Sequence, residues 1–436
     1  MKFGGTSLGD APSLLQVVEI VHRQLARHPV VVVSAHAGVT DGLLALASAA
    51  ATGAPDPAAI EARHRDILHR LGLPGDLLDP LLDDLRDLVR GLRLVGNVSP
   101  RAVDLLLSFG ERLSARTVAG ALRVAGIPAT AVDAFRAGLR TDSAFGRARP
   151  LPDDGRIARA IAAVEGVPVI TGFVAADEHG NITTLGRNGS DYSAALFGAA
   201  LGAEEIQIWK DVDGVRTADP RLVPGARSIR SMTFEEACEL SSFGSKVLHP
   251  ASMLPAMQGG IPVLVRNTRE PSQPGTRIEV GAPGTGTPVV AIAHRRGAAA
   301  LTVGSRRLMP QHAFLARLFA TLDGVGCAIG PVAVSEAAVV VVVDAAGSEA
   351  ALPQLAELGD VRIERDLGVV GVVGDAEALA NGAAGAVLDV LAAAGIPVRC
   401  ASLGARGSTV SLVLADEAVP RAVVALHARF FAGAAS

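Results

Sequence analysis

Residues 185–195 read L-G-R-N-G-S-D-Y-S-A-A, and this stretch decides how the rest of the chain is interpreted. Two threonines precede it and mostly small apolar residues follow it, which is the pattern of a strand end, a glycine turn and a helix. The glycines let backbone N–H groups approach a ligand, and the helix N-terminus adds partial positive charge. Arg187 can bind a carboxylate with two hydrogen bonds, and Ser190 and Asp191 add a hydroxyl and a carboxylate. Taken alone, the stretch is better explained as a capped helix after a turn, so a function for it needs a second motif.

A second glycine turn lies at the start of the chain, where residues 2–7 read K-F-G-G-T-S. A cation, two glycines and two hydroxyls suit a loop that surrounds phosphate oxygens with backbone amides. The order is not that of a P-loop, because the lysine precedes the glycines, and a dinucleotide-binding fingerprint is also missing. Together the two turns resemble the signatures of the aspartokinases, in the amino-acid kinase family, and are similar to the monofunctional lysine-sensitive type.

The resemblance implies an α/β protein with the amino-acid kinase fold, a mostly parallel sheet with helices on both faces, followed by two βαββ ACT-like regulatory modules. Alternation of strand and helix from residue 30 to 265 favours the same kind of sheet. We expect a catalytic domain over residues 1–280 and a Gly/Pro-rich linker over 281–288. A tandem ACT-like region then covers 289–436, with modules at about 298–366 and about 367–436.

Composition excludes several other classes of protein. A chain of 436 residues suggests two to four domains, and a net charge of −4 implies no nucleic-acid partner. The longest apolar runs have the length of a strand, so we expect no membrane association, and no signal peptide is visible. Cys238, Cys327 and Cys400 are widely spaced and form neither a disulfide framework nor a metal motif, which favours a cytoplasmic protein with reduced thiols.

The resemblance assigns the phosphate chemistry to Lys2, Asp191 and Lys246. Lys246 lies in residues 241–250, S-S-F-G-S-K-V-L-H-P, which are similar to the family motif F-G-A-K-V-L-H-P with Ser245 in place of Ala. Lys2 and Lys246 would neutralise the transferred group, and Asp191 would orient Lys2 or the metal shell. A lysine at the end of a first strand should follow several apolar residues, so we expect that this strand is shortened or that the true start lies upstream of Met1.

The resemblance also places the amino-acid substrate on Thr40, Glu111, Arg187 and Ser190. Thr40 follows the buried strand P-V-V-V-V-S of residues 29–34, and Glu111 ends the S-F-G-E stretch of a helix. An amino acid needs an anion for its ammonium and a cation for its α-carboxylate, and Glu111 and Arg187 supply that pair. His36 is interpreted as a loop residue, because phosphoryl transfer to a carboxylate needs no general base.

Residues 205–220, E-I-Q-I-W-K-D-V-D-G-V-R-T-A-D-P, resemble the family's nucleotide loop, with Arg216 where many members have Tyr. ATP and Mg²⁺ are the implied cofactors, and no side-chain motif for a metal is present. The residues expected to contact the nucleotide are Gly4, Gly5, Thr6, Ser7, Lys210, Asp211, Arg216, Arg221 and Lys246.

The C-terminal region departs from the lysine-sensitive pattern. Two rough strand–helix–strand–strand copies match the family in pattern more than in residues. Ala313 stands where those members have Gly, and Gly330 stands where they have an Asp for the effector ammonium. We therefore expect weak inhibition by lysine or none. The residues expected to form the regulatory site are Phe314, Leu315, Gly330, Ser335 and Glu336.

The predicted function is that of an aspartate kinase, which converts L-aspartate and MgATP to 4-phospho-L-aspartate and ADP. This would be the first step toward lysine, threonine and methionine, or toward a specialised aspartate-derived product. Two alternatives stay open: a kinase for another acidic amino acid or an aspartate analogue, and a catalytically silent amino-acid sensor. The resemblance further implies an amino-acid effector at the ACT-like region and a homodimer or dimer of dimers.

Overall fold

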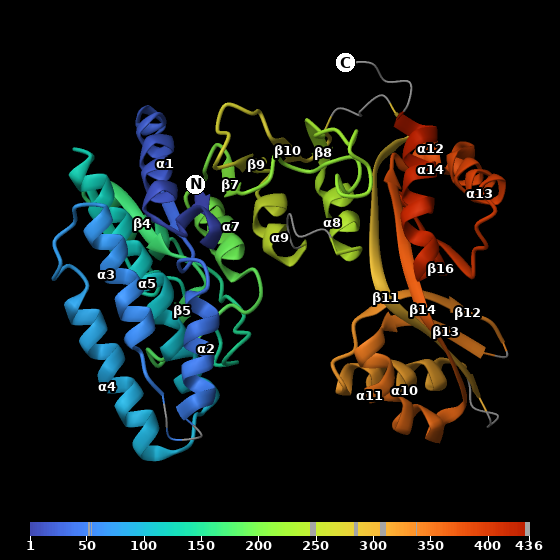
Figure 1. Ribbon diagram of the computed structural model, residues 1–436, viewed down its shortest axis with the longest axis horizontal. Helices are drawn as coiled ribbons and strands as arrows, with labels where there is room; N and C mark the ends of the chain where they lie inside the picture. Colours follow the sequence, from blue (N-terminus) through green and yellow to red (C-terminus); the bar gives the residue numbers. More distant parts are fainter. Residues whose placement is uncertain are drawn as a thin grey trace. The chain divides into compact units, whose positions relative to one another are not determined.

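The computed structural model describes residues 1–50, 53, 55–244, 250–282, 287–305, 311–336 and 338–431. Its internal contacts divide the chain into two compact units, which Figure 1 colours by sequence from blue to red. Unit 1 comprises Met1–Val215 and Leu248–Gly281, and unit 2 comprises Arg216–Val247 and Ala282–Ser436. This division differs from the predicted domain boundaries by the segment Arg216–Val247, which groups with the C-terminal region.

Unit 1 alternates strands and helices, as its sequence pattern predicts. Its strands are β1 (Lys2–Phe3), β2 (Val31–Val33), β3 (Ala129–Val132), β4 (Val167–Thr171), β5 (Val174–Ala176), β6 (Ile182–Thr184), β7 (Ile206–Lys210), β9 (Val263–Asn267) and β10 (Thr276–Glu279). Its helices are η1 (Gly5–Leu8), α1 (Ala11–His22), η2 (Leu25–Arg27), α2 (Val39–Ala50), α3 (Ala58–Arg70), α4 (Asp79–Val95), α5 (Pro100–Val124), α6 (Arg156–Ala162), α7 (Gly189–Ala200) and α9 (Pro250–Gln258).

The main sheet of unit 1 has the strand order β3-β4-β2-β1-β7-β9-β10. The pairs from β3 to β9 are parallel, and β10 is antiparallel to β9. The chain leaves β1 for β2 on one side and returns to β7 on the other, so the strand order reverses at β1. A ligand crevice is expected outside the carboxyl ends of the strands at such a point. The predicted parallel α/β sheet is confirmed.

Helices cover both faces of this sheet. The long helix α5 packs against β2, β3 and β4 and contacts α1, α2 and α4, whereas α7 and α9 pack together on the opposite face (Figure 1). The strand β2 is buried along its whole length, as expected for an apolar run at the centre of a parallel sheet. The chain between β2 and α5 forms the separate helices α3 and α4, because Gly72 and Pro74 interrupt the helical sequence between them.

Unit 2 contains the predicted strand–helix–strand–strand copies. Its strands are β8 (Ser231–Thr233), β11 (Val289–Ser305), β12 (Ile329–Val334), β13 (Ala338–Asp344), β14 (Gly359–Gly374), β15 (Cys400–Leu403) and β16 (Thr409–Ala415). Its helices are α8 (Phe234–Ser242), α10 (Gln311–Gly324), α11 (Ala345–Leu358), α12 (Ala376–Ala378), η3 (Leu379–Ala383), α13 (Ala384–Ala393), η4 (Asp416–Ala418) and α14 (Val419–Phe431).

The two copies are fused into one antiparallel sheet of order β12-β13-β11-β14-β16-β15. Its two central strands, β11 and β14, are 17 and 16 residues long and pair from one end to the other, with register shifts near Val289 and between Arg295 and Ala300 (Figure 1). One apolar cluster lies under α10 and α11, and a second lies under α13 and α14. The sequence analysis did not predict α11, whose residues A-A-G-S-E-A-A-L-P resemble a loop in composition.

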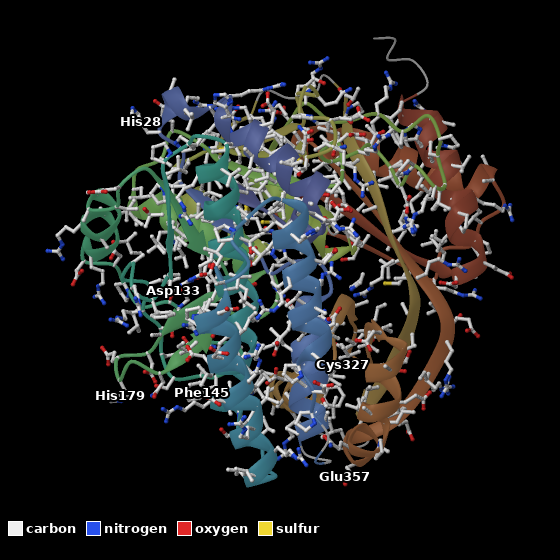
Figure 2. The ribbon with its side chains drawn as sticks, turned by 60° about the vertical axis from the view of Figure 1, so that its left-hand side comes forward. His28, Asp133, Phe145, His179, Cys327 and Glu357 are labelled. Atoms are coloured by element: carbon white, nitrogen blue, oxygen red, sulfur yellow. The ribbon has the colours of Figure 1, made fainter. Side chains whose placement is uncertain are left out.

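Within the described residues, one helical stretch, Ala376–Ala393, is apolar and long enough to cross a membrane by length and composition alone. Its backbone is non-helical at Asn381 and Gly382, so α12 and α13 are separate helices. Val387 and Leu391 of α13 are fully buried in the cluster under α13 and α14. The buried residues of the stretch pack in that cluster, whereas most of its other residues are exposed or half-buried. All three cysteines are free thiols, and Cys327, labelled in Figure 2, is buried.

Candidate active site

Three charged side chains meet at the carboxyl ends of β1 and β7. Lys2 is the first residue of the two-residue strand β1, Lys210 is the last residue of the neighbouring strand β7, and Asp191 enters from the first turn of α7. The Asp191 carboxylate lies 2.7 Å from Lys2 Nζ through Oδ1 and 3.1 Å from Lys210 Nζ through Oδ2. The side chains are only 7%, 3% and 16% exposed for Lys2, Asp191 and Lys210. The structure thus brings Lys2, which was predicted to bind the phosphate, and Lys210, which was predicted to contact the nucleotide, onto one buried carboxylate.

Electrostatics in this cluster favour an anion. Burial works against ionisation of Asp191, but the charges of Lys2 and Lys210 outweigh it and lower the pKa of the carboxyl. Burial also lowers the pKa of Lys210, and the neighbouring charge of Lys2 acts in the same direction, while Asp191 raises it. Lys2 and Lys210 thus both face the single carboxylate of Asp191, and the charge of Asp211 also acts on Lys210. Two ammonium groups held close together suit a phosphoryl group.

The first glycine turn lies directly against this cluster. Gly4 N–H donates to the Trp209 carbonyl at 3.2 Å, and a Cβ at Gly4 would lie 3.6 Å from Lys2 Nζ. A Cβ at Gly5 would lie 3.0 Å from the Ala35 carbonyl, so this position is tight for any larger residue. Thr6 is exposed, whereas Ser7 is buried with its hydroxyl 2.7 Å from that of Thr268. The contacts of these residues with a nucleotide stay a prediction.

Glu111 presents a buried carboxyl from α5. It is 4% exposed, and no hydrogen-bond partner of its Oε2 lies among the described residues. Burial raises the pKa of Glu111 to about 8, although a hydrogen bond from the Ala35 backbone and the charge of Lys2 lower it in part. An ammonium group brought to this carboxyl would stabilise its charged form. The arrangement therefore fits the predicted ammonium site.

The motif that opens the sequence analysis forms a turn with left-handed backbone at Gly186 and Asn188, before α7 begins at Gly189. Arg187 projects from this turn, is exposed, and has no hydrogen bond or ion pair with any described residue. Ser190 is buried, and its Cβ would lie 2.7 Å from a Cβ at Gly172, so the turn packs closely on the end of β4. A guanidinium of this kind is available to a carboxylate ligand.

Thr40 is half-buried in the first turn of α2, after the loop that ends β2. Thr40 thus lies beyond the carboxyl end of β2, the strand next to β1 in the sheet, which is consistent with its predicted substrate role.

The sequence analysis missed Asp104, which anchors this part of the site. Asp104 is fully buried two turns before Glu111 on α5. Its carboxylate accepts hydrogen bonds from the Thr184 N–H at 2.9 Å, the Thr184 hydroxyl at 2.8 Å and the Gly146 N–H at 2.9 Å. These contacts attach the loop that carries Phe145, labelled in Figure 2, to the strand before Arg187. An aspartate inside an apolar helix stretch is the sequence signal that could have identified it.

A second buried carboxylate, Asp133, fixes α5 to the end of β3. Asp133 (Figure 2) is 1% exposed, and Arg116 binds both of its oxygens, with Nη2 at 3.0 Å from Oδ2. Arg112 adds its charge at 3.8 Å. Because Arg112 directly follows Glu111 on α5, this ion pair helps to hold the helix that presents Glu111.

Other predicted site residues lie outside this cluster. Asp211 is exposed directly after β7 in unit 1. Arg216 and Arg221 belong to unit 2, where Arg216 donates to the Ala226 carbonyl at 3.2 Å and Arg221 pairs with Asp219 at 2.6 Å. Lys246, Ser245 and His249 lie outside the described residues. The nucleotide roles of these residues stay predictions.

The predicted regulatory residues are spread over unit 2. Phe314 is buried in the cluster under α10, and Leu315 is half-buried next to it. Ser335 Oγ binds the Ala338 backbone, and Glu336 is exposed. Gly330 lies at an irregularity in the pairing of β12 with β13. A Cβ there would lie 2.8 Å from a guanidinium nitrogen of Arg295.

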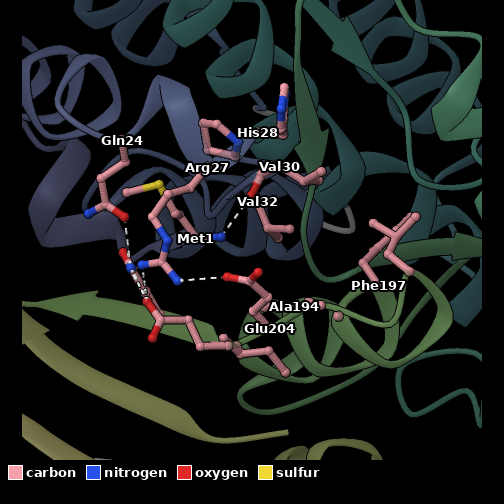
Figure 3. Close-up of a pocket in the computed structure, with 16 residues that line it drawn as sticks. Met1, Gln24, Arg27, His28, Val30, Val32, Ala194, Phe197 and Glu204 are labelled. Atoms are coloured by element: carbon pink, nitrogen blue, oxygen red, sulfur yellow. Dashed lines mark hydrogen bonds and ion pairs between the residues drawn. The ribbon is translucent and has the colours of Figure 1, made fainter.

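The cavity in Figure 3 lies at the other end of the strands. It has a volume of about 270 Å³ and is lined by the amino ends of β1, β2 and β7 together with Arg27 and Glu204. Arg27 pairs with Glu205 at 2.7 Å and with Glu204 at 3.3 Å. None of the predicted site residues lines this cavity, so it is separate from the charged cluster. Among the described residues, no group of three or more His, Cys, Asp or Glu side chains could hold a metal ion.

Comparison with known proteins gives a consistent result over the whole chain. Residues 1–267 match the model of the amino acid kinase family. Aspartokinase 2 of Arabidopsis thaliana, a chloroplastic protein, is 33% identical over 456 residues, which cover 99% of this chain and 84% of that protein. The lysine-sensitive aspartokinase 3 of Escherichia coli is 34% identical over 452 residues, which cover 99% and 98%.

Solved structures are similar over the same length. E. coli aspartokinase III in complex with aspartate and ADP, in the R-state, superimposes with a TM-score of 0.82 at 32% identity and covers 99% of both chains. The T-state complex of the same enzyme with lysine and aspartate gives a TM-score of 0.81.

Proposed function

The chain belongs to the amino acid kinase family, and from this premise we propose that it is an aspartate kinase. The enzyme transfers the γ-phosphoryl group of ATP to the β-carboxylate of L-aspartate and releases ADP and 4-phospho-L-aspartate. The observation that carries this proposal is the buried cluster of Lys2, Asp191 and Lys210 beside a glycine turn, with the Glu111 carboxyl on the neighbouring helix. The two lysines fit a nucleotide phosphate, and the Glu111 carboxyl fits the ammonium group of an amino acid.

Phosphoryl transfer needs positioning and charge neutralisation more than covalent help from the protein. Lys2 and Lys210 place positive charge where negative charge spreads over the transferred group. Asp191 holds both ammonium groups in fixed positions, so they need little reorganisation during the reaction. The turn of Gly4 and Gly5 is proposed to approach the phosphate oxygens, with the Gly5 amide toward them because the Gly4 amide donates to the Trp209 carbonyl, and Lys246 is proposed as a further phosphate-binding lysine.

Mg²⁺ is proposed as the cofactor together with ATP. The described residues contain no cluster of three metal-binding side chains, and the Asp191 carboxylate already faces two lysines. This donor set fits an ion held mainly by nucleotide phosphates and water, with few protein ligands. When bound, the ion would supply charge neutralisation between the β- and γ-phosphates.

Aspartate binding is proposed to use both charged groups on the α-carbon of the substrate, the ammonium and the carboxylate. Glu111 receives the α-ammonium, and the free guanidinium of Arg187 receives the α-carboxylate. Thr40 and Ser190 would complete the pocket and leave the β-carboxylate directed toward the phosphate turn. A buried carboxyl requires a cationic partner, so Glu111 disfavours N-acylated substrates, which have no ammonium.

An ADP-release assay tests the proposal with L-aspartate, L-glutamate and N-acetyl-L-glutamate as acceptors. Hydroxylamine trapping of the acyl phosphate should accompany ADP release with L-aspartate and not with the other two compounds. Preference for L-glutamate or its N-acetyl derivative would assign a different substrate. Absence of ADP release with every acceptor would leave the sensor alternative.

Unit 2 is proposed to bind an amino-acid effector, since an E. coli relative with the same chain organisation has been solved with lysine. A homodimer or dimer of dimers and a cytoplasmic location are proposed with it. Sedimentation velocity with and without candidate amino acids measures the assembly directly.

A further inference from the structure

A buried histidine connects the glycine turn at the start of the chain with the loop between β2 and α2. His36 lies in the loop between β2 and α2 and is 1% exposed. Its Nδ1 lies 2.6 Å from the carbonyl oxygen of Leu8, the last residue of η1. The η1 segment follows Gly4 and carries the phosphate turn, and the His36 loop leads to Thr40. One side chain therefore joins the phosphate turn to the substrate loop.

Two backbone contacts support the same junction. Ala37 N–H donates to the Gly5 carbonyl at 3.1 Å. The Ala35 carbonyl lies 3.0 Å from the position of a Cβ at Gly5, so the two turns are packed main chain to main chain. The same Ala35 backbone reaches the Glu111 carboxyl. A shift of the His36 loop would therefore move substrate-binding groups relative to the phosphate turn.

A second histidine holds the ring of His36 in place. His64 of α3 is also 1% exposed, and its ring centroid lies 5.2 Å from that of His36 in an edge-to-face arrangement. His64 Nδ1 lies 2.7 Å from the Ile60 carbonyl, one turn earlier on α3. Since a carbonyl only accepts, both rings carry their proton on Nδ1. Neither buried Nε2 has a hydrogen-bond partner among the described residues.

Both rings stay neutral in the folded protein. Burial lowers the pKa of His36 to about 3, and the neighbouring His64 and Arg63 act in the same direction. Burial likewise lowers the pKa of His64, with Arg63 acting in the same direction and the Ile60 carbonyl opposing it. A neutral His36 with its proton fixed on Nδ1 can hold the Leu8 carbonyl at a constant distance from the loop between β2 and α2.

We propose that His36 is a positioning residue for phosphoryl transfer. Its Nδ1–H bond to Leu8 sets the distance between the phosphate turn and the substrate loop, and His64 keeps the donor aimed at the carbonyl. Each subsite can bind its own ligand without this contact, but the β-carboxylate then no longer lies in line with the γ-phosphate. This inference rests on the proposed aspartate kinase activity.

The test compares four variants of the full-length protein. His36→Leu keeps an apolar side chain in the site but removes the donor. His36→Asn places an amide donor near the position of Nδ1, and His36→Gln places it near the position of Nε2. His69→Leu changes an exposed histidine on α3, the helix that carries His64, and serves as the control.

We expect His36→Leu to lower kcat about 10-fold or more, because small misplacements of reacting groups are costly, while the KM for ATP and for aspartate stay within about twofold. His36→Asn should retain most of kcat, and His36→Gln should resemble His36→Leu. The yield of trapped hydroxamate per ADP should fall in the impaired variants, since misaligned ATP reacts with water instead.

Several outcomes overturn the inference. One is an unchanged kcat in folded His36→Leu. Another is equal activity of the Asn and Gln variants, which applies even where the Leu variant does not fold. A third is a loss that follows the fall in melting temperature across all variants. A wild-type protein without aspartate-dependent ADP release would refute the proposed function itself, which is a distinct result.

Discussion

Oδ1 of Asp191 lies 2.7 Å from Nζ of Lys2, and both side chains are almost fully buried. The second oxygen of the same carboxylate lies 3.1 Å from Nζ of Lys210. One acidic residue on α7 thus controls the position of two cations that come from separate strands. This relationship makes Asp191 the residue whose replacement should be most informative.

Asp191→Asn should abolish most of the activity. The amide cannot hold two ammonium groups, and removal of one partner from a buried ion pair costs about 3–5 kcal/mol of folding free energy. We expect kcat to fall by ~10²-fold or more, as for other losses of transition-state electrostatic contacts. Steady-state rates and thermal unfolding measure the two effects. Asp87→Asn removes an exposed surface pair and should change neither. A kcat near that of the wild type in folded Asp191→Asn would contradict the role of the cluster.

The buried Glu111 carboxyl should make aspartate binding depend on pH. Its pKa is about 8 in the free protein, so aspartate meets a mostly protonated carboxyl at neutral pH. Binding of the ammonium then requires loss of a proton, and kcat/KM for aspartate should rise about tenfold per pH unit between pH 6 and pH 7 and level off near pH 8. Glu111→Gln should flatten this profile and lower kcat/KM. Calorimetry at pH 7 in buffers of different ionisation enthalpy should show release of about one proton in the wild type only.

The raised pKa of Glu111 should also make the free energy of unfolding depend on pH. The folded pKa of Glu111 lies above its unfolded value of 4.5. Its contribution is fully present below about pH 4.5 and is lost as the pH rises toward 8, because only the unfolded state ionises freely in that range. The difference in free energy of unfolding between wild type and Glu111→Gln should therefore change with pH in this window. A difference that stays constant from pH 5 to pH 8 would show that the carboxyl is not held protonated.

Arg187→Ala should weaken the binding of aspartate and leave the binding of ATP nearly unchanged. The guanidinium is exposed and has no partner among the described residues, so its removal should not disturb folding. We expect a KM for aspartate at least ~10-fold higher with the KM for ATP nearly unchanged, since a bidentate charged contact is lost. Arg187→Lys should restore little, because an ammonium cannot make the paired contact. An unchanged KM for aspartate would remove Arg187 from the substrate site.

Arg295 and Gly330 should make the enzyme insensitive to lysine. A guanidinium nitrogen of Arg295 lies 2.8 Å from the Cβ position at Gly330, where lysine-sensitive relatives are expected to carry an acidic residue. Millimolar L-lysine should therefore not inhibit. Gly330→Asp alone should not restore inhibition, because the new carboxylate would pair with Arg295, whereas Gly330→Asp with Arg295→Ala should bind lysine measurably by calorimetry. Inhibition of the unmodified enzyme by micromolar lysine would refute this reading.

Much of the fold and the identity of the charged residues could be predicted from the sequence. The buried strand of residues 29–34 and the glycine turns have local signatures, and the structure places them as expected. Glu111 and Asp191 were identified because their motifs are specific. The pairing of Lys210 with Asp191 was not predicted, because it depends on which strands are neighbours in the sheet.

Burial was the harder property to predict. His36 was interpreted as a loop residue, yet α3, which packs on it, is distant in sequence and buries it completely. Asp104 was overlooked because its three donors come from segments about 40 and 80 residues away. Local patterns contain no information on such partners, since the partners are defined only when the helices pack on the sheet.

The two long strands of unit 2 have a consequence for its melting. β11 and β14 pass through both apolar clusters, although their pairing shifts register between Arg295 and Ala300, so each half shares its two central strands with the other. The backbone amides of both halves should therefore exchange with deuterium as one slow group, with a single free energy of opening. A bend introduced at one end of these strands would also be felt at the other, about 50 Å away along a fully extended ribbon of this length.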